Sequence, residues 1–350
     1  MAKIRVKNIY YMLSYTFRML SEEKYHDIAV EEFEYAADLL AAILAKGISS
    51  QIKRGLGRDY IQRSESLSMP RRKIDIAVSI KEQKIISRKL VCIYDSYEEN
   101  TYLNQILKST IYCLIKSDEV KAEQKKALKK LVLHFSNVDI VALKRVRWNA
   151  IQYSKNNETY KMLIYICRLI VEGLILSDEK GNMKMSKYID DRKMYDLYEK
   201  FLLAYYNKHY PELNPKSSWI DWNEDNGFFE LLPTMKSDIT LKYQGKITII
   251  DAKFYSKMFQ YNPRYHTKTL HSDNLYQIFT YVKNKDTNHD GSVSGVLLYA
   301  KTEDEEDLDK TYIFNKSQIS VKSLDLNQDF KAIQKSLNTI ADNLIIQNMI

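Results

Sequence analysis

Two segments decide the fold of this chain: Met235-Lys-Ser-Asp-Ile-Thr-Leu241 and Ile249-Ile-Asp-Ala-Lys-Phe-Tyr255. Apolar and polar residues alternate in the first segment, and the run Lys246–Ile250 that leads into the second is rich in β-branched residues. Both patterns are typical of β-strands. The residues that join them, Tyr243-Gln-Gly-Lys246, are typical of a tight turn. The sequence therefore predicts a β-hairpin.

Three charged residues of this hairpin, Asp238, Asp251 and Lys253, are suited to phosphodiester chemistry. Side chains alternate along a strand, so Asp251 and Lys253 share a face, and the hairpin returns Asp238 towards Asp251. Burying charges at a strand end costs free energy unless something uses them. Two carboxylates and an ammonium are suited to hold Mg²⁺ and to activate a water molecule. The alternative is an ordinary surface ion pair, which contributes little to stability.

Two predicted helices carry further candidate residues on either side of the hairpin. Upstream, Met194–Tyr206 has an apolar stripe at helical spacing, and Glu199 lies on the border of that stripe. Downstream, Asn274–Tyr281 places Gln277 and Tyr281 one helical turn apart on one face. Taken singly, Glu199 also fits a helix-surface carboxylate, and Gln277 and Tyr281 fit residues at the edge of a core.

The order of these residues resembles the PD-(D/E)XK nuclease superfamily, in the branch with a Gln-x-x-x-Tyr helix. Over nearly the whole chain the sequence is similar to the McrC family, the nuclease subunits of McrBC modification-dependent restriction systems. The most specific matches are Leu231-Leu-Pro-Thr-Met-Lys-Ser-Asp-Ile-Thr240, Ile250-Asp-Ala-Lys-Phe-Tyr255 and His271-Ser-Asp-Asn-Leu-Tyr-Gln277. Supporting matches are Val6-Lys-Asn-Ile-Tyr-Tyr-Met-Leu-Ser-Tyr15, Arg54-Gly-Leu56 with Tyr60, and Leu103-Asn-Gln-Ile-Leu-Lys-Ser-Thr110. The chain departs from the family at Pro70–Asp75, where Arg72 occupies the position of a glycine.

The resemblance and the periodicity together imply an α+β or α/β chain with two domains. Residues 1–180 are expected to form a partner-docking domain of helices with a small β-rich unit at 47–94, and residues 181–350 a PD-(D/E)XK endonuclease domain. The endonuclease domain is expected to have a mixed central sheet flanked by helices. Apolar spacing in the first domain predicts helices at Asn8–Leu20, Glu31–Ala45, Tyr102–Ile115 and Met162–Leu176, and a strand at Lys73–Ile80.

The resemblance also implies a role for each candidate residue. The expected ligands of one or two Mg²⁺ ions are carboxylates and one main-chain carbonyl: Asp238, Asp251, Glu199 and Ala252. Lys253 is expected to orient the attacking water and to stabilise the charge that develops on the phosphate. Gln277 and Tyr281 are expected to hold a phosphate or a catalytic carboxylate by hydrogen bonds.

Partners follow from the same resemblance. The N-terminal domain is expected to dock in the pore of a McrB-like hexameric AAA+ GTPase and to stimulate it, with Arg54 or Arg58 acting across the interface. The chain lacks a phosphate-binding loop motif, so GTP is expected to bind to the partner. Double-stranded DNA with modified cytosine is the expected substrate, contacted along its backbone by Lys257, Arg264 and His271. The resemblance leaves open a homodimer through the nuclease domain.

The composition is compatible with these expectations. The chain has 350 residues with 45% hydrophobic and 28% charged residues, which is typical of a globular protein. Its formal charge of +8 fits an anionic partner. The three cysteines show no metal-type spacing, and the first residues alternate charged and apolar side chains. We therefore expect a soluble cytoplasmic protein with no signal peptide, no disulfide and no membrane segment.

Two other functions stay open at this stage. The first is a stand-alone repair or recombination nuclease of the same superfamily, which would digest plain DNA with Mg²⁺ alone. The second is a catalytically inert DNA-binding scaffold, for which Asp251→Ala would leave cleavage by the full complex unchanged.

Overall fold

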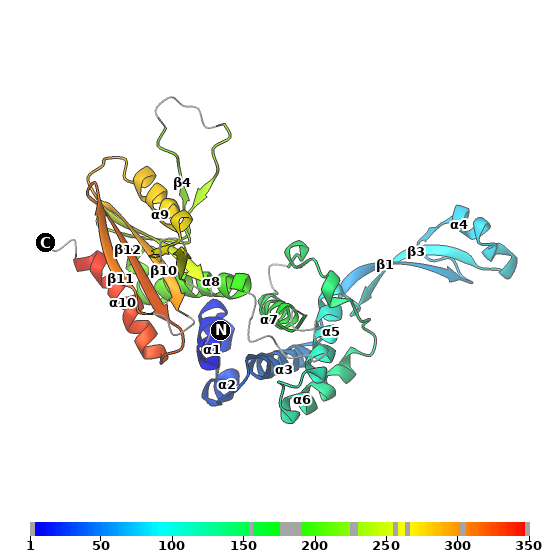
Figure 1. Cartoon of the computed structure of the whole chain (residues 1–350). Coiled ribbons are helices and arrows are strands. Elements are labelled where there is room, and N and C mark those ends of the chain that lie inside the picture. Colours follow the sequence, from blue (N-terminus) through cyan, green and yellow to red (C-terminus); the bar gives the residue numbers. More distant parts are fainter. Residues whose placement is uncertain are drawn as a thin grey trace. The chain divides into compact units, whose positions relative to one another are not determined.

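The computed structural model describes residues 4–153, 157–175, 191–224, 230–254, 258–262, 267–301 and 306–346. They form two compact units (Figure 1). One comprises Met1–Leu39 with Ser186–Ile350 and is called the sheet unit here; the other, Leu40–Met185, is called the arm unit. In the part of the chain that the structure describes, no helix is long and apolar enough to cross a membrane.

The sheet unit is built around a five-stranded mixed sheet in the order β11-β12-β10-β7-β6. Strands β7, β10 and β12 are parallel, and the two edge strands run antiparallel to their neighbours. The sheet strands are β6 (Ile239–Tyr243), β7 (Lys246–Phe254), β10 (Val293–Lys301), β11 (Asp309–Phe314) and β12 (Ser317–Asp325). Two small ribbons accompany it, β4 (Trp219–Ile220) with β5 (Met235–Lys236), and β8 (Phe259–Asn262) with β9 (Thr267–Leu270). The helices are α1 (Val6–Thr16), α2 (His26–Val30), α8 (Asp191–His209), α9 (Ser272–Lys285) and α10 (Phe330–Ile346).

The predicted hairpin is present as β6 and β7. Its closing pair is Tyr243 and Lys246, so the turn consists of two residues, Gln244 and Gly245. Both have positive φ values, 43° and 85°, as two-residue hairpin turns of the primed type require. The mixed sheet flanked by helices is likewise as expected.

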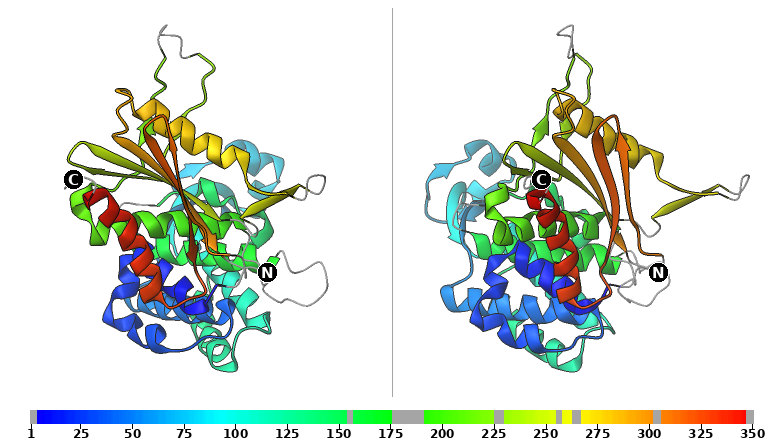
Figure 2. Two further views of the ribbon diagram at one scale, coloured as in Figure 1. Left: turned by 60° about the vertical axis from the view of Figure 1, so that its left-hand side comes forward. Right: turned by 90° about the vertical axis from the view of Figure 1, so that its left-hand side faces the viewer.

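Helices cover the two faces of the sheet (Figure 2). Helix α9 lies on one face, over a core that includes Ile249, Leu297 and Val321. Helices α8 and α10 lie on the other face, where the ring of Tyr198 is 6.1 Å from that of Phe254.

A glycine lets α9 approach the sheet closely. A Cβ atom at Gly295 would lie only 2.7 Å from Ile278 Cγ1 and 2.9 Å from Val282 Cγ2. These distances are shorter than packed carbon atoms accept, so any larger residue at Gly295 would push the helix away from β10. The close approach matters because α9 carries Gln277 and Tyr281.

The first residues of the chain belong to the sheet unit. Asn8 in α1 donates hydrogen bonds of 2.8 Å to the carbonyls of Leu326 and Gln328, which link β12 to α10. Tyr11 in α1 stacks on Phe330 at 4.4 Å between ring centroids. The expected division at residue 180 differs from this arrangement, because it assigns residues 1–39 to the N-terminal domain. Contacts between residues more than 300 positions apart leave no local pattern in the sequence.

The arm unit consists of a helical body and a projecting three-stranded arm (Figure 1). The arm strands lie in the order β1-β3-β2, all antiparallel. Its strands are β1 (Asp59–Leu67), β2 (Lys73–Ile74) and β3 (Leu90–Glu98), with helix α4 (Ile76–Lys81) near the tip. The body helices are α3 (Ala36–Arg54), α5 (Tyr102–Lys116), α6 (Ala122–Val132) and α7 (Glu158–Ile175), where α3 begins in the sheet unit. The helices expected at Tyr102–Ile115 and Met162–Leu176 correspond to α5 and α7.

Four expectations for element boundaries were wrong. The first helix ends at Thr16. The second helix begins at Ala36 and continues to Arg54. The β-rich unit expected at 47–94 therefore starts only at Asp59, and it extends to Glu98. The helix continues because Ile48 is fully buried on its core face. The strand expected at Lys73–Ile80 is limited to two residues. There Asp75 caps α4 by accepting a hydrogen bond of 3.0 Å from the Val78 amide.

The departure from the family at Arg72 has a visible backbone consequence. Arg72 has a φ of 56°, in the left-handed region that glycine adopts without penalty. A side chain in this conformation costs about 1–2 kcal/mol. The turn therefore keeps the glycine-type geometry despite the substitution.

Candidate active site

The charged residues of the hairpin converge at the end of β7. The Asp251 and Lys253 side chains are only 1% and 8% exposed, and Lys253 Nζ lies 2.7 Å from Asp251 Oδ2. Lys253 also donates a hydrogen bond of 2.9 Å to Gln277 Oε1, and Gln277 Nε2 donates one of 2.8 Å to the Tyr281 hydroxyl. The strand motif and the Gln-x-x-x-Tyr helix are thus joined by one chain of polar contacts.

Asp238 is aimed at this cluster by a β-bulge. The segment Lys216–Ile220 runs antiparallel to Met235–Thr240. Ser237 N donates to Ser218 O at 2.9 Å, and Thr240 N donates to Lys216 O at 2.7 Å. Between these two bonds, one strand contributes a single residue and the other contributes two, of which Asp238 is one. Bulges of this kind redirect a side chain out of the regular pleat.

Hydroxyl groups hold the bulge in place. Ser237 and Thr240 are both 99% buried, and their hydroxyl oxygens lie 2.7 Å apart. Ser217 Oγ donates to the Ser237 carbonyl at 2.6 Å, and Ser237 Oγ accepts from Ser218 N at 3.1 Å. Sequence reasoning missed these residues, because the partner segment of Ser237 lies about twenty positions upstream and is only two strand residues long.

The main chain of Ala252 faces the Asp238 side chain. Strand β6 pairs with β7 only as far as Ile250, and beyond that point Ala252 N donates a hydrogen bond of 2.8 Å to Asp238 Oδ2. In an antiparallel ladder the N–H and C=O of one residue point to the same side. The Ala252 carbonyl therefore points to the side on which Asp238 lies, as a main-chain metal ligand at this position requires.

Helix α8 supplies two more polar groups. The Tyr195 hydroxyl donates to Asp238 Oδ2 over a long distance of 3.4 Å. Glu199 lies one turn further along the helix and is half-buried, and the charge of Asp238 contributes to raising its pKa. Tyr195 is a further residue that the sequence did not single out.

Burial raises the pKa of each carboxyl group in the cluster. Loss of solvation, together with repulsion from Asp238, raises the pKa of Glu199 to about 7. Loss of solvation raises the pKa of Asp251 to about 6 even though Lys253 acts in the opposite direction, and burial also raises the pKa of Asp238. When all three are ionised, the three carboxylates and the Lys253 ammonium leave two negative charges, which a divalent cation would balance.

The donor set fits a hard divalent cation such as Mg²⁺. Among the described residues, Asp251 Oδ2 is buried and accepts no hydrogen bond of good geometry, although Lys253 Nζ is close. Within the described ranges no group of three or more His, Cys, Asp or Glu side chains is placed to hold a metal ion together. Mg²⁺ usually needs only one or two carboxylates, because water and substrate phosphates complete its octahedral shell.

The residues expected to contact the DNA backbone are only partly within the structure. Lys257 and Arg264 lie outside the described residues. His271 is half-buried and occupies the position before the first residue of α9, without capping the helix through its side chain. Its role in DNA binding stays a prediction.

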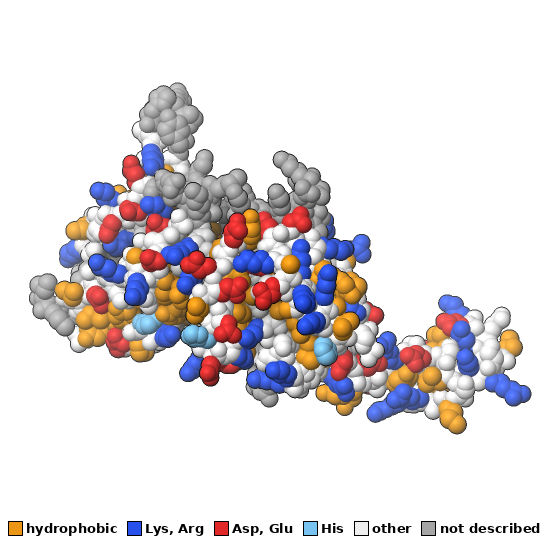
Figure 3. Space-filling view, turned by 90° about the horizontal axis from the view of Figure 1, so that it is seen from below, with side chains coloured by type: hydrophobic (Ala, Val, Ile, Leu, Met, Phe, Trp, Pro, Cys, Tyr) orange, Lys and Arg blue, Asp and Glu red, His pale blue; other side chains and the backbone are white. Residues whose placement is uncertain are grey.

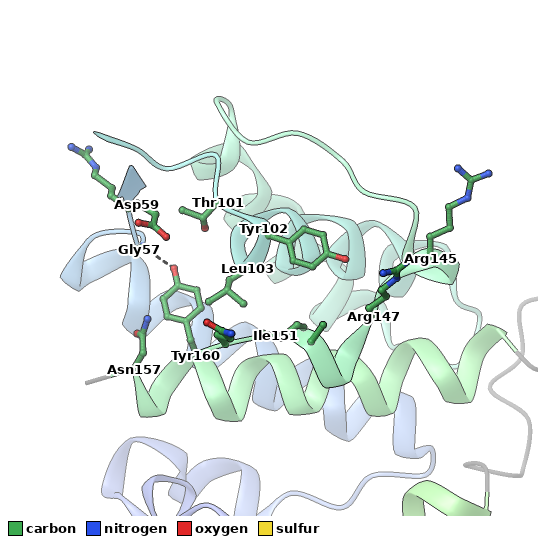
Figure 4. A pocket seen from close by; sticks show the side chains of 13 residues that line it. Gly57, Asp59, Thr101, Tyr102, Leu103, Arg145, Arg147, Ile151, Asn157 and Tyr160 are labelled. Atoms are coloured by element: carbon green, nitrogen blue, oxygen red, sulfur yellow. Dashed lines mark hydrogen bonds between the residues drawn. The ribbon is translucent and has the colours of Figure 1, made fainter. Parts of the chain in front are cut away.

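The two arginines expected to stimulate a GTPase lie in the arm unit. Arg54 is the last residue of α3 and is exposed. Arg58 lies at the base of the arm, where its guanidinium donates to Glu99 Oε1 at 2.8 Å. Arg58 lines a cavity of about 660 Å³ between the start of β1 and helices α5 and α7 (Figure 4). In its wall, the buried Tyr160 hydroxyl accepts from Gly57 N and donates to Asn104 Oδ1.

The tip of the arm presents apolar and basic side chains to solvent. Met69, Ile76, Ile80 and Ile86 are 60–81% exposed. Arg71, Arg72 and Lys73 are exposed beside them, and hydrophobic and basic side chains are interspersed over the arm (Figure 3). Apolar side chains this exposed at the end of a projecting element are characteristic of a surface that binds another protein.

The fold and the cluster define a mixed α/β protein with buried carboxylates and a lysine at the end of a central strand. The sequence matches the family of McrBC 5-methylcytosine restriction system components over residues 3–300, and the chain belongs to this family. It is 28% identical over 346 residues to the Type IV methyl-directed restriction enzyme EcoKMcrBC of Escherichia coli K12, with 98% of each chain covered. The resemblance inferred from the motifs is confirmed.

Two chains in solved structures are also similar to this chain. The chain is similar to one in the half-complex of Thermococcus gammatolerans McrB AAA+ hexamers with bound McrC, with 16% identity and a TM-score of 0.47. That match covers 94% of this chain and 76% of the other. A second match, to a chain of the Thermococcus gammatolerans McrBC complex, has 17% identity and a TM-score of 0.39, and covers 55% and 56% of the two chains.

Proposed function

We propose that this chain is the Mg²⁺-dependent DNA endonuclease subunit of a GTP-driven, modified-cytosine-specific restriction complex in the cytoplasm. The observation that carries the proposal is a buried cluster at the end of β7: Asp251 lies 2.7 Å from the Lys253 ammonium, and Asp238, in the bulge before β6, accepts a hydrogen bond from Ala252 N. A buried cluster of this kind destabilises a fold unless a ligand balances its charge. Its presence in a chain that belongs to a restriction-system family supports a catalytic role in a PD-(D/E)XK type of centre.

Asp238, Asp251 and the Ala252 carbonyl would hold the metal ion, and Glu199 would reach it directly or through water. The ion supplies electrostatic activation of a water molecule and of the scissile phosphate. Because the pKa of Asp251 is about 6 and that of Glu199 about 7, these carboxyl groups give up their protons when the cation binds. Metal binding is therefore expected to strengthen as the pH rises through this range.

Lys253 would stabilise the charge that develops on the phosphate during attack. Its ammonium has a fixed position because Asp251 and Gln277 both contact it. The Gln277 amide is itself fixed, since it donates to the Tyr281 hydroxyl. In this arrangement Gln277 and Tyr281 are positioning residues that keep the ammonium directed at the substrate.

The arm unit would bind the GTPase partner. Its exposed isoleucines supply an apolar contact, and its basic residues supply attraction to an acidic pore. The Thermococcus complex contains McrB AAA+ hexamers with bound McrC, which is the assembly proposed for this chain. Recognition of the modified base and hydrolysis of GTP are assigned to the partner, and Arg54 or Arg58 to stimulation of that hydrolysis.

Cleavage of methylated plasmid DNA by the reconstituted complex tests the proposal. The chain and its GTPase partner are mixed with GTP and Mg²⁺, and linear product is measured for wild type and for Asp251→Asn. Wild type should cut methylated DNA only, whereas Asp251→Asn should not cut although GTP turnover persists. Digestion of plain DNA by the chain with Mg²⁺ alone would favour a stand-alone nuclease. Unchanged cutting by Asp251→Asn would leave only a scaffold role.

A further inference from the structure

An exposed tryptophan stands next to the acidic cluster. Trp219, the first residue of β4, leaves 63% of its surface accessible. Tryptophan is normally among the more buried residues, and where its ring is exposed it commonly serves as a contact surface. Its neighbour in the ribbon, Ile220, is 96% buried and packs in the core under α9.

The ribbon pairs this tryptophan with a lysine. Trp219 lies opposite Lys236 in the antiparallel pair of β4 and β5, so their side chains share one face. Lys236 Nζ lies 5.5 Å from the centroid of the indole ring, within cation–π range. The other face of the ribbon is occupied by Ile220 and Met235, which are buried against the core. Trp219 and Lys236 therefore face away from the core.

The pair adjoins the proposed catalytic residues. Lys236 precedes Asp238 by two positions, at the start of the bulge that aims its carboxylate. Burial raises the pKa values of Asp238 and Glu199, and the charge of Lys236 acts in the opposite direction on both. Lys236 is thus within electrostatic reach of both carboxylates.

We infer that Trp219 and Lys236 form a DNA subsite beside the scissile phosphate. In this subsite Lys236 binds a flanking phosphate, and the Trp219 indole packs against the adjoining sugar and base. The carboxylates repel a polyanion, so a cation and an aromatic surface at their edge supply the attraction that brings a strand to the centre. The inference rests on the proposed nuclease function and adds the residues that position its substrate.

DNA binding by the full-length chain tests the subsite. The probe is a short fluorescent DNA duplex, and the background is the Asp251→Asn variant, which prevents cleavage. Trp219→Ala should weaken binding about 5- to 150-fold, as loss of a stacking contact does, without changing the salt dependence. Trp219→Phe should retain most of the affinity. Lys236→Gln should lower the slope of log K against log salt by about 1, because one phosphate contact is lost.

Matched controls lie on β11, the edge strand of the five-stranded sheet opposite β6. Tyr312→Ala removes an exposed aromatic ring and Lys310→Gln an exposed ammonium from β11. Neither should change affinity or salt slope. If Trp219→Ala behaves like Tyr312→Ala, or if the chain shows no measurable DNA binding, the inference is wrong.

Cleavage by the complex separates this inference from the proposed function. If wild type cuts and Asp251→Asn does not, but Trp219→Ala has the same KM and kcat as Tyr312→Ala, the subsite fails while the nuclease stands. If no variant cuts, but binding depends on Trp219 and Lys236 as described, the subsite stands and the nuclease proposal fails.

Discussion

The end of β7 buries charged side chains, whereas the tip of the arm exposes apolar ones. At the end of β7, Asp251 and Lys253 are buried, whereas at the tip Ile76 and Ile86 are exposed. Each arrangement is unfavourable for an isolated protein, because buried charges lose solvation and exposed isoleucines order water. Under the proposed function, a cation and a phosphate offset the cost of the buried cluster, and a partner protein covers the apolar side chains of the arm.

Removal of the buried Lys253 ammonium should have the largest effect on DNA cleavage. We expect Lys253→Met to lower cleavage by the complex about 10²- to 10³-fold or more, as when one group that stabilises transition-state charge is removed. GTP turnover should persist, since the arm is unchanged. Lys246→Met, at the start of the same strand, is the matched control and should cut normally. Equal activity of the two variants would contradict a catalytic role for the cluster.

Removal of a buried charge should stabilise the metal-free protein. The pKa of Asp251 is about 6 when folded and lies near 3.8 when unfolded, so the folded state binds the proton more tightly. The contribution of Asp251 to stability is therefore fully present below about pH 4 and is lost as the pH rises from there through about 6. The full loss is about 3 kcal/mol.

Chemical unfolding in EDTA between about pH 4 and pH 8 measures this effect, and most of the change from Asp251 is expected between about pH 4 and pH 6. Asp251→Asn should be more stable than wild type at the upper end by up to about 3 kcal/mol, while losing activity. A slope that remains near pH 7 in the variant belongs to Glu199, whose pKa is about 7. If the free energy of unfolding of wild type rises with pH in this range, burial does not raise the pKa of Asp251 as described.

The sequence predicted the local elements of the candidate site better than the long-range pairing that supports them. The β6–β7 hairpin and the Gln277–Tyr281 pair were predictable, because alternation, a Gln-Gly turn and helical spacing are local patterns. The bulge at Asp238 was not, since it depends on pairing with Lys216–Ile220 across some twenty residues. A strand was expected at Lys73–Ile80 because β-branched residues favour strands, but the Asp75 cap starts a helix there.

Substitution of exposed isoleucines should disrupt only assembly. Ile76→Asp with Ile86→Asp is expected to weaken binding of the GTPase partner by about 2 kcal/mol or more, or about 30-fold. The fold should be unaffected, because both side chains are mostly exposed. Binding is measured by titration of the partner, and unfolding by thermal denaturation.

Ile140→Ser is the control for the arm tip. Ile140 is 65% exposed, and the adjoining Asp139 bonds to Asn100 at the base of the arm. This variant should bind the partner like wild type. Should it weaken binding as much as the tip variant does, the contact surface would extend over the body of the arm unit.

A small effect on stability is also expected for Arg58, and comparison with a variant of its ion-pair partner tests its role. Its ion pair with Glu99 is half-exposed, so Arg58→Ala should change the free energy of unfolding by at most about 1 kcal/mol. Glu99→Gln breaks the same pair but leaves the guanidinium in place. If Arg58 acts on the GTPase, Arg58→Ala lowers the stimulated GTP turnover and Glu99→Gln does not. If the ion pair only shapes the base of the arm, both variants lower turnover equally, and Arg54→Ala becomes the variant that tests stimulation.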